Sequence, residues 1–373
     1  MEKKEKKILL ICNLSQNIYT FRLPLIKRLQ EEGYKVYTIA FDDAYADTLK
    51  EEGVDFRKVE GKNRSLNPFK MMKLKNDYCK IIKEINPDIV FTFQLKPNIF
   101  GALAAKKAGI KNIYSMVEGA GDAFIKKSLK WKVINFVECK LYKKAFKNVK
   151  NVFFLNNDDI QEFISRKLLK KEQAVVVNGI GVDLDKFKFK TVEKSSNKFI
   201  MIARMLETKG IYEYCKVAEI VKKSHPEAEF LYLGAEGTVK ISDIQKYIDS
   251  GTINYLGTAK DVKPFIESSI AMILPSRREG MPMTIMEAEA IGRAIITSDR
   301  IGCKETVEDG FNGYRVDCND VETMANHCIE LLENKDKAVE FGKNSRKFAE
   351  THFDQKLINS QILEIINKGK WYA

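Results

Sequence analysis

Histidine is scarce in this chain, and the few histidines are poorly placed to hold a metal ion. His225, His327 and His352 lie in the second half, and none has a metal-ligating neighbour at a useful spacing. Protein zinc sites take their ligands from His, Cys and carboxylate side chains at short, recurrent intervals. The sequence therefore predicts that no metal takes part in the protein's activity.

Paired cysteines and long apolar runs are also missing. The seven cysteines are scattered and form no C-x-x-C motif, so we expect free thiols that fill a core in a reducing cytosol. No apolar run reaches the length that spans a bilayer. The charged segment 1–7 leads directly into an expected strand, without the apolar core of a signal peptide.

The positive charge is concentrated in the first half. Residues 1–190 contain 38 Lys and Arg against 23 Asp and Glu, whereas the remainder contains 25 against 28. This balance predicts an anionic partner, which could be a nucleic acid, an anionic lipid surface or a phosphorylated substrate. The basic residues are spread over many elements and form no known nucleic-acid-binding signature. We therefore expect no nucleic acid partner.

Strands and helices alternate in two successive sets. The first set has expected strands at 7–13, 36–41, 54–59, 88–93, 112–117, 152–156 and 174–177, and the second at 199–203, 230–234, 253–256, 271–275, 294–298 and 314–316. Such alternation predicts parallel sheets covered by helices. We expect an α/β fold of two Rossmann-like, doubly wound domains that face each other across a cleft. The expected domains are 1–190 and 191–354, joined at the polar run 190–197, with an amphipathic final helix at 355–373.

One strand–turn–helix segment carries the strongest functional signal. An apolar strand over 269–274 is followed by a polar turn, and Pro282 suits the start of a helix over 283–291. Gly280 allows close ligand approach, and the first N–H groups of the helix form an anion site. Glu279 and Glu287 flank this site and would repel a phosphate, so they suit neutral sugar hydroxyls. An ordinary strand–turn–helix with two unrelated acids is the alternative.

Two basic residues follow the first strand of the second domain. Arg204 and Lys209 flank a short loop that opens a helix, which is where such sheets bind phosphate. A cation about 4 Å from a phosphate oxygen gains roughly 4 kcal/mol at an effective dielectric constant of 20. A solvated basic pair is the alternative interpretation.

An acidic residue closes a strand of the first domain. Glu118 stands before Gly119 and Gly121, which permit a tight turn and close ligand approach. We expect Glu118 at the ligand-binding edge of the first sheet, although an acid at a helix start is the alternative. Asp183 and Asp185 form a D-x-D motif, which we interpret as a turn and not as a metal site.

A basic amphipathic segment spans residues 124–150. Apolar residues recur every fourth position from Ile125 through Leu129 to Ala145, and Trp131 is of an interfacial type. The segment carries nine lysines against one acid, Glu138: Lys126, Lys127, Lys130, Lys132, Lys140, Lys143, Lys144, Lys147 and Lys150. This pattern indicates a helix on a membrane surface or a packing helix with a solvated basic face.

The combination of Arg204, Lys209 and Glu279-x7-Glu287 resembles the donor site of family 4 glycosyltransferases with the GT-B fold. The segment from Asn178 to Asp183 is also similar to that family. The resemblance implies a UDP-sugar donor, with N-acetylgalactosamine (GalNAc) as the expected sugar, and transfer with retention of configuration. It further implies a polyprenyl-diphosphate-linked acceptor, no metal or other cofactor, and a peripheral position on the cytoplasmic face of the inner membrane. The final helix is expected to return to the first domain.

The resemblance also implies roles for individual residues. Arg204 and Lys209 would hold the donor diphosphate, Glu279 a hydroxyl of the transferred sugar, and Glu287 the ribose hydroxyls. The remaining donor contacts would come from the backbone at Leu256, Thr258, Gly280, Met281, Pro282 and Met283. The acceptor and the anionic membrane would be contacted by Asn17, Arg64, Glu118, Lys126, Lys127, Lys130 and Trp131.

A sugar-nucleotide epimerase of the same fold is the main alternative function. Such an enzyme would bind the same donor but would consume it without any lipid acceptor. We do not expect a glycoside hydrolase, because its two carboxylates must flank the scissile bond, whereas Glu279 and Glu287 bracket an anion site.

Overall fold

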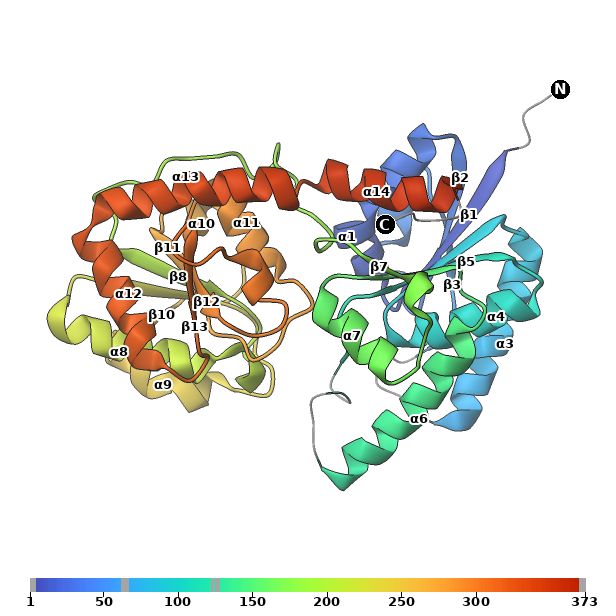
Figure 1. Ribbon diagram of the computed structural model, residues 1–373, viewed down its shortest axis with the longest axis horizontal. Coiled ribbons are helices and arrows are strands. Elements are labelled where there is room, and N and C mark those ends of the chain that lie inside the picture. Colours follow the sequence, from blue (N-terminus) through green and yellow to red (C-terminus); the bar gives the residue numbers. More distant parts are fainter. Residues whose placement is uncertain (1–4, 62–66, 122–123, 125–127, 369–373) are drawn as a thin grey trace. The chain divides into compact units, whose positions relative to one another are not determined.

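The computed structural model describes residues 5–61, 67–121, 124 and 128–368 (Figure 1). The chain divides into two compact units. Unit 1 comprises residues 1–177 and 359–373, and unit 2 comprises residues 178–358.

The described part of unit 1 contains a seven-stranded sheet in the order β3-β2-β1-β4-β5-β6-β7, and every pairing is parallel. Its strands are β1 (Lys6–Ile11), β2 (Tyr34–Ala40), β3 (Asp55–Lys58), β4 (Ile89–Phe93), β5 (Asn112–Val117), β6 (Asn151–Phe154) and β7 (Ala174–Val176). Its α-helices are α1 (Ser15–Glu31), α2 (Ala46–Glu51), α3 (Pro68–Ile85), α4 (Ala102–Lys107), α6 (Leu129–Phe146) and α7 (Asn157–Ser165), and η1 (Pro97–Gly101) is a π-helical turn before α4.

The described part of unit 2 contains a six-stranded parallel sheet in the order β10-β9-β8-β11-β12-β13. Its strands are β8 (Lys198–Ile202), β9 (Glu229–Leu233), β10 (Asn254–Tyr255), β11 (Ala271–Leu274), β12 (Ala294–Ser298) and β13 (Gly313–Val316). Its helices are η3 (Glu207–Lys209), α8 (Ile211–Ser224), α9 (Ile241–Asp249), α10 (Lys263–Glu267), α11 (Met283–Ile291), η4 (Lys304–Thr306), α12 (Val321–Glu333) and α13 (Lys335–His352). Helix α14 (Gln355–Lys368) begins in unit 2 and continues into unit 1.

The central strands are apolar on both faces because helices cover both sides of each sheet. Every residue of β4 and of β11 is buried, as expected for parallel strands in a doubly wound fold. The strand order reverses between β1 and β4 in unit 1 and between β8 and β11 in unit 2. In such sheets ligands bind at the carboxyl ends of the strands beside this reversal. The expected architecture of two doubly wound α/β domains is confirmed.

The boundary between the units lies at 177/178, not at the expected residue 190. The segment after Val177 belongs to unit 2 because its backbone bonds there: Val182 N–H donates to Phe353 O (2.7 Å) and Lys190 N–H to Ile291 O (2.9 Å). The polar run 190–197 is therefore not a linker, and Val192 within it is buried.

The last helix also departs from the expected limits. Unit 2 continues to Ile358, past the expected end at 354, and the chain joins unit 1 from Asn359. Tyr34 Oη donates to Asn367 Oδ1 (2.5 Å) and Tyr114 Oη to Ile366 O (3.4 Å). These two bonds attach the end of α14 to β2 and β5.

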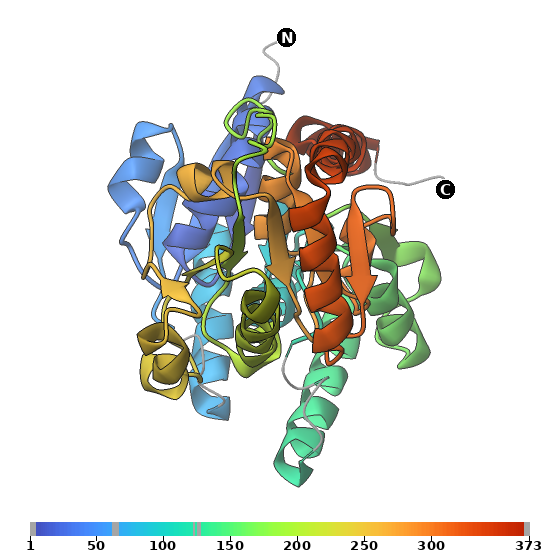
Figure 2. The ribbon, with the colours of Figure 1, turned by 90° about the vertical axis from the view of Figure 1, so that its left-hand side faces the viewer.

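Helix α6 is only partly packed against unit 1. Tyr142, Ala145 and Phe146 near its end are buried, whereas Leu129 and Val133 are 79% and 59% exposed. Much of the expected apolar stripe thus lies on the surface. Figures 1 and 2 show the free end of α6 projecting from unit 1. Among the described helices, none combines the length and apolar character needed to cross a membrane.

Candidate functional site

The turn between β11 and α11 holds the predicted carboxylate Glu279. Ser276, three residues earlier in the same turn, is fully buried, and its hydroxyl donates to Glu279 Oε1 (2.6 Å). The turn is fixed to the neighbouring loop because Arg277 N–H donates to Thr208 O (2.8 Å). Glu279 is therefore held in place by backbone and hydroxyl contacts on both sides.

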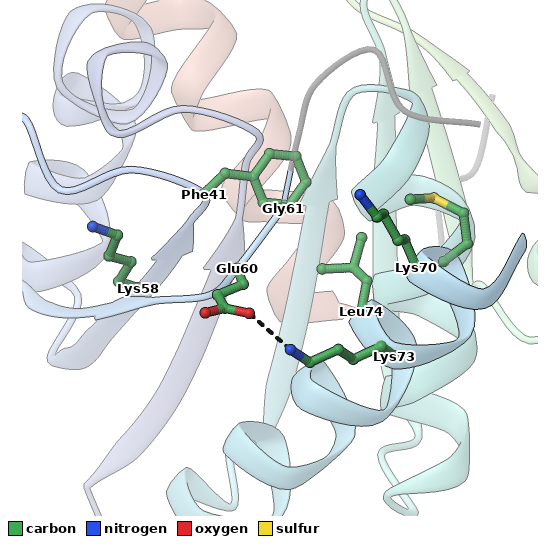
Figure 3. Close-up of a pocket in the computed structure, with 8 residues that line it drawn as sticks. Phe41, Lys58, Glu60, Gly61, Lys70, Lys73 and Leu74 are labelled. Carbon is green, nitrogen blue, oxygen red and sulfur yellow. Dashed lines mark hydrogen bonds and ion pairs between the residues drawn. The ribbon is translucent and has the colours of Figure 1, made fainter. Parts of the chain in front are cut away.

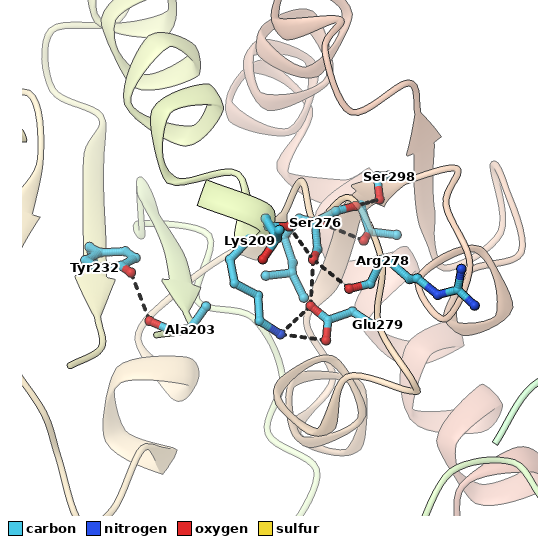
Figure 4. Close-up of polar contacts among 10 residues, drawn as sticks. Ala203, Lys209, Tyr232, Ser276, Arg278, Glu279 and Ser298 are labelled. Carbon is cyan, nitrogen blue, oxygen red and sulfur yellow. Dashed lines mark hydrogen bonds and ion pairs between the residues drawn. The ribbon is translucent and has the colours of Figure 1, made fainter. Parts of the chain in front are cut away.

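Lys209 and Glu279 are brought together although they are 70 residues apart in sequence. Lys209 Nζ lies 2.5 Å from Glu279 Oε1 and 2.6 Å from Oε2, and Figure 4 shows Lys209 and Ser276 converging on this carboxylate. Lys209 is about a quarter exposed and Glu279 about a tenth. The positive charge predicted to bind a phosphate is thus compensated by the carboxylate predicted to bind a sugar hydroxyl.

A glycine supports Glu279 from behind. Gly302 has a φ of +82°, and a Cβ atom there would lie 2.3 Å from Glu279 O. Glu279 N–H donates to Ile301 O (2.9 Å), and Gly302 N–H donates to Glu305 Oε2 (2.8 Å). Sequence reasoning missed Ser276 and Gly302. Ser276 could have been found because it stands three residues before Glu279, but the partner of Gly302 is set by tertiary packing.

Arg204 differs from Lys209 in its surroundings. Arg204 follows β8 and is exposed, and among the described residues its side chain has no hydrogen-bond or ion-pair partner. Its loop is held because Tyr232 Oη donates to Ala203 O (2.9 Å; Figure 4). Gly210 closes the loop at a φ of +78°, where a Cβ would lie 2.3 Å from Pro275 O. Of the two predicted phosphate-binding cations, Arg204 is therefore uncompensated and Lys209 is paired.

Helix α11 begins beside this cluster. The helix spans Met283–Ile291, as predicted. Pro282 is its N-cap and therefore stands one position before the first helical residue. The first N–H groups of a helix have no partner within it, and Gly280, Met281 and Pro282 form the approach to them. The predicted anion site lies at this helix start.

Glu287 lies on the second turn of α11 and is half-buried. Burial raises the pKa of Glu287 to about 7, while Lys186 lowers it and Asp261 raises it by smaller amounts. Two residues later, Glu289 is fully buried and accepts from Asn312 Nδ2 (2.8 Å). Burial raises the pKa of Glu289 well above its usual value. Only Glu287 is thus both accessible and titrating near neutral pH.

The turn expected to contact the nucleotide base follows the short strand β10. Leu256 N–H already donates to Tyr232 O (2.9 Å), and Gly257 O accepts from Gly234 N–H (2.8 Å). The backbone of Leu256 is therefore partly used by the sheet. Thr258 is exposed beyond this bond, so it is the more available of the two predicted residues.

In unit 1, Glu118 follows β5 and forms an ion pair with Arg22 of α1. Arg22 is 3% exposed, and its guanidinium carbon lies 4.4 Å from the centre of the Phe93 ring. Burial lowers the pKa of Arg22 to about 10, so it remains charged at neutral pH. Sequence reasoning missed this partner because Arg22 and Glu118 stand on separate elements.

The other predicted acceptor and membrane residues are distributed over unit 1. Asn17 lies half-buried in the first turn of α1, Lys130 is exposed at the start of α6, and Trp131 is half-buried beside it. Arg64, Lys126 and Lys127 lie outside the described residues. The D-x-D motif is a turn as predicted, because Asp183 Oδ1 accepts from the N–H groups of Asp185 and Lys186 (2.9 Å each).

A separate cavity of about 410 Å³ lies in unit 1 beside β3 and α3 (Figure 3). Three lysines and one acid line it together with apolar residues: Phe41, Lys58, Glu60, Gly61, Lys70, Met71, Lys73 and Leu74. Lys73 Nζ lies 2.7 Å from Glu60 Oε2, and Lys58 pairs with Asp43 (2.9 Å). The lining is therefore cationic on balance.

No group of three or more His, Cys, Asp or Glu residues that could hold a metal ion occurs within the described ranges. All seven cysteines are free thiols, and six of them are buried, which confirms their assignment to the core.

Both halves of the chain match family models of glycosyltransferases. Residues 7–156 match the model "Glycosyl transferase 4-like" and residues 183–348 match "Glycosyl transferases group 1". The chain is 29% identical over 371 residues to the N,N'-diacetylbacillosaminyl-diphospho-undecaprenol alpha-1,3-N-acetylgalactosaminyltransferase of Campylobacter jejuni, covering 96% of this chain and 97% of that one. It is 27% identical over 291 residues to the UDP-Gal:alpha-D-GlcNAc-diphosphoundecaprenol alpha-1,3-galactosyltransferase of Escherichia coli, covering 73% of each.

Solved structures agree on the fold. Anabaena HepE in complex with UDP and glucose has a TM-score of 0.80 at 17% identity, covering 97% of this chain and 99% of HepE. A glycosyltransferase from Rickettsia africae has a TM-score of 0.77 at 22% identity, covering 98% of this chain and 99% of its own. The resemblance inferred from the motifs is thereby confirmed.

Proposed function

Because the chain belongs to the glycosyltransferases with the GT-B fold, we propose that it transfers GalNAc from UDP-GalNAc to a saccharide carried on a polyprenyl diphosphate. The new bond would be an α-1,3 linkage formed with retention of configuration. The similarity to the Campylobacter jejuni transferase over almost the entire length of both chains supports this donor and acceptor.

The observation that carries the proposal is the cluster at the carboxyl edge of β8 and β11. It combines the exposed Arg204, the ion pair of Lys209 with Glu279 and the start of α11. Cations and helix N–H groups suit a diphosphate, whereas a carboxylate suits sugar hydroxyls. A nucleoside diphosphate joined to a neutral sugar presents both kinds of group, so it matches this mixed cluster better than a free phosphate does.

Donor binding would redistribute the charge of this cluster. In the structure, Lys209 satisfies both oxygens of Glu279. When a diphosphate arrives, Lys209 can turn its N–H groups toward the phosphate, and Glu279 can then accept a hydroxyl of the transferred sugar while Ser276 keeps it in place. Glu287 would accept the ribose hydroxyls, and the base would lie near Thr258.

The same cations would assist bond breaking. As the bond between the anomeric carbon and the phosphate oxygen breaks, negative charge accumulates on the departing UDP. Arg204, Lys209 and the N-terminus of α11 would stabilise this charge more than the ground state. The acceptor hydroxyl would form the new bond to the anomeric carbon and pass its proton to a phosphate oxygen of UDP. No divalent cation is required in this scheme.

The acceptor side would lie in unit 1, which would bind an anionic membrane surface. Six large apolar side chains are exposed on α3 and α6: Phe69, Met72, Leu129, Val133, Phe136 and Val137. Both helices run antiparallel to the strands, so both begin at the carboxyl edge of the sheet, and Figures 1 and 2 show these ends on the same side of unit 1. Lys70 and Lys73 accompany the first group, and Lys130, Lys132 and Lys140 the second. Apolar side chains interspersed with lysines are typical of surfaces that bind anionic bilayers. This surface would place the enzyme peripherally on the cytoplasmic face of the inner membrane.

The test is a donor and acceptor panel with the purified protein. UDP-GalNAc, UDP-GlcNAc, UDP-Gal and UDP-Glc would each be incubated with and without undecaprenyl-diphosphate-linked diacetylbacillosamine, followed by mass spectrometry and assignment of the linkage by NMR. We expect one added hexosamine only with UDP-GalNAc and the lipid acceptor, with or without EDTA. Conversion of the donor in the absence of acceptor would instead identify an epimerase.

A further inference from the structure

Three neighbouring strands of unit 1 end in polar side chains at the point where the strand order reverses. Asn13 comes after β1, Gln94 after β4 and Glu118 after β5, and β1, β4 and β5 are adjacent in the sheet. The reversal between β1 and β4 is where doubly wound sheets receive ligands. The chemistry of these three side chains therefore bears on what unit 1 binds.

Asn13 has a buried acceptor without a partner. Its side chain is 8% exposed, and among the described residues nothing donates a hydrogen bond to its Oδ1 atom. The backbone around it is satisfied, because Asn13 N–H donates to Gln94 Oε1 (2.9 Å) and Asn13 O accepts from Phe41 N–H (2.9 Å). A buried unsatisfied acceptor destabilises the fold. At this edge of the sheet, where ligands bind, a hydroxyl group of a ligand would satisfy the acceptor.

The backbone of Gln94 is strained at the same place. Gln94 has a φ of 72°, a left-handed conformation that is unfavourable for residues with a side chain. Strain of this kind gathers at ligand sites, where the surrounding structure holds it. Here the strain turns the Gln94 side chain toward Asn13 N–H, which fixes the loop that carries Asn13.

Arg22 is the buried partner that orients Glu118. The ion pair between them is asymmetric, since the side chain of Arg22 is 4% exposed and that of Glu118 is 24% exposed. Arg22 is further fixed by the Phe93 ring and by Met116 Sδ, 3.6 Å from its Nη1 atom. A buried cation without its carboxylate would be strongly unfavourable. Arg22 therefore holds the carboxylate at the edge of the sheet, with part of Glu118 left accessible.

We propose that Asn13 and Glu118 bind hydroxyl groups of the acceptor saccharide, and that Arg22 is the positioning residue for Glu118. Both groups are hydrogen-bond acceptors, one a buried amide oxygen and one a partly accessible carboxylate, so they select groups that donate hydrogen bonds. The charge of Glu118 is balanced by Arg22, which favours a neutral sugar over an anion or a cation. This assignment rests on the proposed transferase function and adds Asn13 and Arg22 to its acceptor side.

Asn13→Ala tests the orphaned acceptor. We expect the KM for the lipid-linked acceptor to rise between about twofold and tenfold, the range that a hydrogen bond between neutral groups contributes. The affinity for UDP should not change, and the Tm should stay equal or rise because an unsatisfied buried group is removed. Asn112→Ala, at the amino end of β5 in the same sheet, is the matched control and should leave the acceptor KM unchanged. A lower Tm with an unchanged acceptor KM would show that Asn13 is only structural, and weaker UDP binding would assign it to the donor.

A double-mutant cycle tests Arg22. Arg22→Met and Glu118→Gln should each lower acceptor kcat/KM between about tenfold and a hundredfold, the range of a hydrogen bond to a charged group. The double variant should be no worse than the weaker single variant, because Arg22 acts through Glu118. Arg22→Lys, which keeps the charge, should recover part of the activity and serves if Arg22→Met does not fold. Arg28→Met, which changes a partly exposed arginine of the same helix, should behave as wild type.

Two results would overturn this inference. If the loss of acceptor kcat/KM in the double variant equals the product of the two single losses, Arg22 acts independently of Glu118. If Glu118→Gln and Asn13→Ala both keep the acceptor KM of the parent, the acceptor sugar binds elsewhere. Both results require an active parent enzyme. Absence of transfer by the parent enzyme would instead contradict the proposed function itself, so the two failures are distinguishable.

Discussion

The carboxyl edges of the two sheets each join a basic residue to a carboxylate, but the two pairs are built differently. In unit 2, Lys209 and Glu279 stand on two loops, and the more exposed partner is the lysine. In unit 1, Arg22 comes from the interior of α1 and is almost fully buried, and the more exposed partner is Glu118. The difference indicates that the pair in unit 2 can open to release a cation toward a ligand, whereas the pair in unit 1 presents a fixed carboxylate.

Removing the cations of unit 2 should have the largest effect. We expect Arg204→Ala and Lys209→Ala each to lower kcat about a hundred- to a thousandfold, because a preorganised charge contact at a reacting centre contributes about 3–4 kcal/mol. Lys209→Ala should also raise the donor KM, because Glu279 then faces the diphosphate without compensation. Steady-state kinetics with UDP-GalNAc provide the measurement.

Exposed lysines elsewhere in unit 2, such as Lys216 on α8, supply the control. Normal turnover by both Arg204→Ala and Lys209→Ala would contradict the proposal that these cations stabilise the departing UDP. Loss of parent activity in EDTA that Mg²⁺ or Mn²⁺ restores would show that a metal performs it.

The second prediction separates the two units by membrane binding. Replacing Lys130, Lys132 and Lys140 of α6 with Gln should weaken association with anionic vesicles about a hundredfold, because each lysine near such a surface contributes about 1 kcal/mol. The matched triple variant in unit 2, at Lys216, Lys223 and Lys343, should bind as the parent does. All six lysines are exposed. The comparison is made by vesicle sedimentation with and without anionic lipid. Equal losses of binding in both triple variants would show that only the net charge of the protein matters, and not the position of the lysines on α6.

The sequence predicted the two-sheet fold, and it also singled out the residues of the proposed donor cluster, because these signals are local. The alternation of apolar strands and helices predicts parallel sheets covered by helices, and Glu279, Pro282 and Glu287 stand in one continuous segment. The site in unit 1 was only partly predictable. Asn13, Arg22 and Gln94 carry no motif, and their significance comes from burial and backbone conformation, which depend on strands that pair across about 80 residues.

One further expectation failed. The polar run 190–197 was predicted to link the domains, yet Val192 is buried and Lys190 bonds to Ile291. Polarity along a segment does not exclude packing of alternate residues. The apolar stripe of 124–150 correctly predicted a helix but did not show which part of it the protein covers, and Leu129 and Val133 of α6 are largely exposed.

The third prediction concerns the residue that holds Glu279. Ser276→Ala removes one hydrogen bond to Glu279 Oε1 and one to Thr208 O, so the carboxylate should lose orientation but keep its pairing with Lys209. We expect kcat to fall about tenfold, since a bond to a charged group contributes about 1.5–3 kcal/mol and Lys209 still restrains Glu279. Ser276→Thr keeps the hydroxyl and should retain more activity than Ser276→Ala. Equal activity of Ser276→Ala and the parent would show that Lys209 alone orients Glu279.

The smallest expected effect is a pH dependence of stability and UDP binding that arises from Glu287 in unit 2. Burial raises the pKa of Glu287 from its usual 4.5 to about 7. Between these pH values the folded protein binds more protons than the unfolded chain, so this group makes the protein less stable as pH rises through the window. Glu287→Gln does not titrate, so its Tm should match that of the parent near pH 5 and exceed it by a few degrees at pH 8.

UDP affinity of the parent should rise through pH 7, because the carboxylate accepts ribose hydroxyls better than the acid does, and this rise should vanish in Glu287→Gln. The control is Glu289→Gln, which makes the same change at the other carboxyl group of α11, whose pKa burial also raises. Thermal scans and UDP titrations at pH 5 and 8 test both statements, and a Tm difference between Glu287→Gln and the parent that does not vary with pH would contradict the assigned titration.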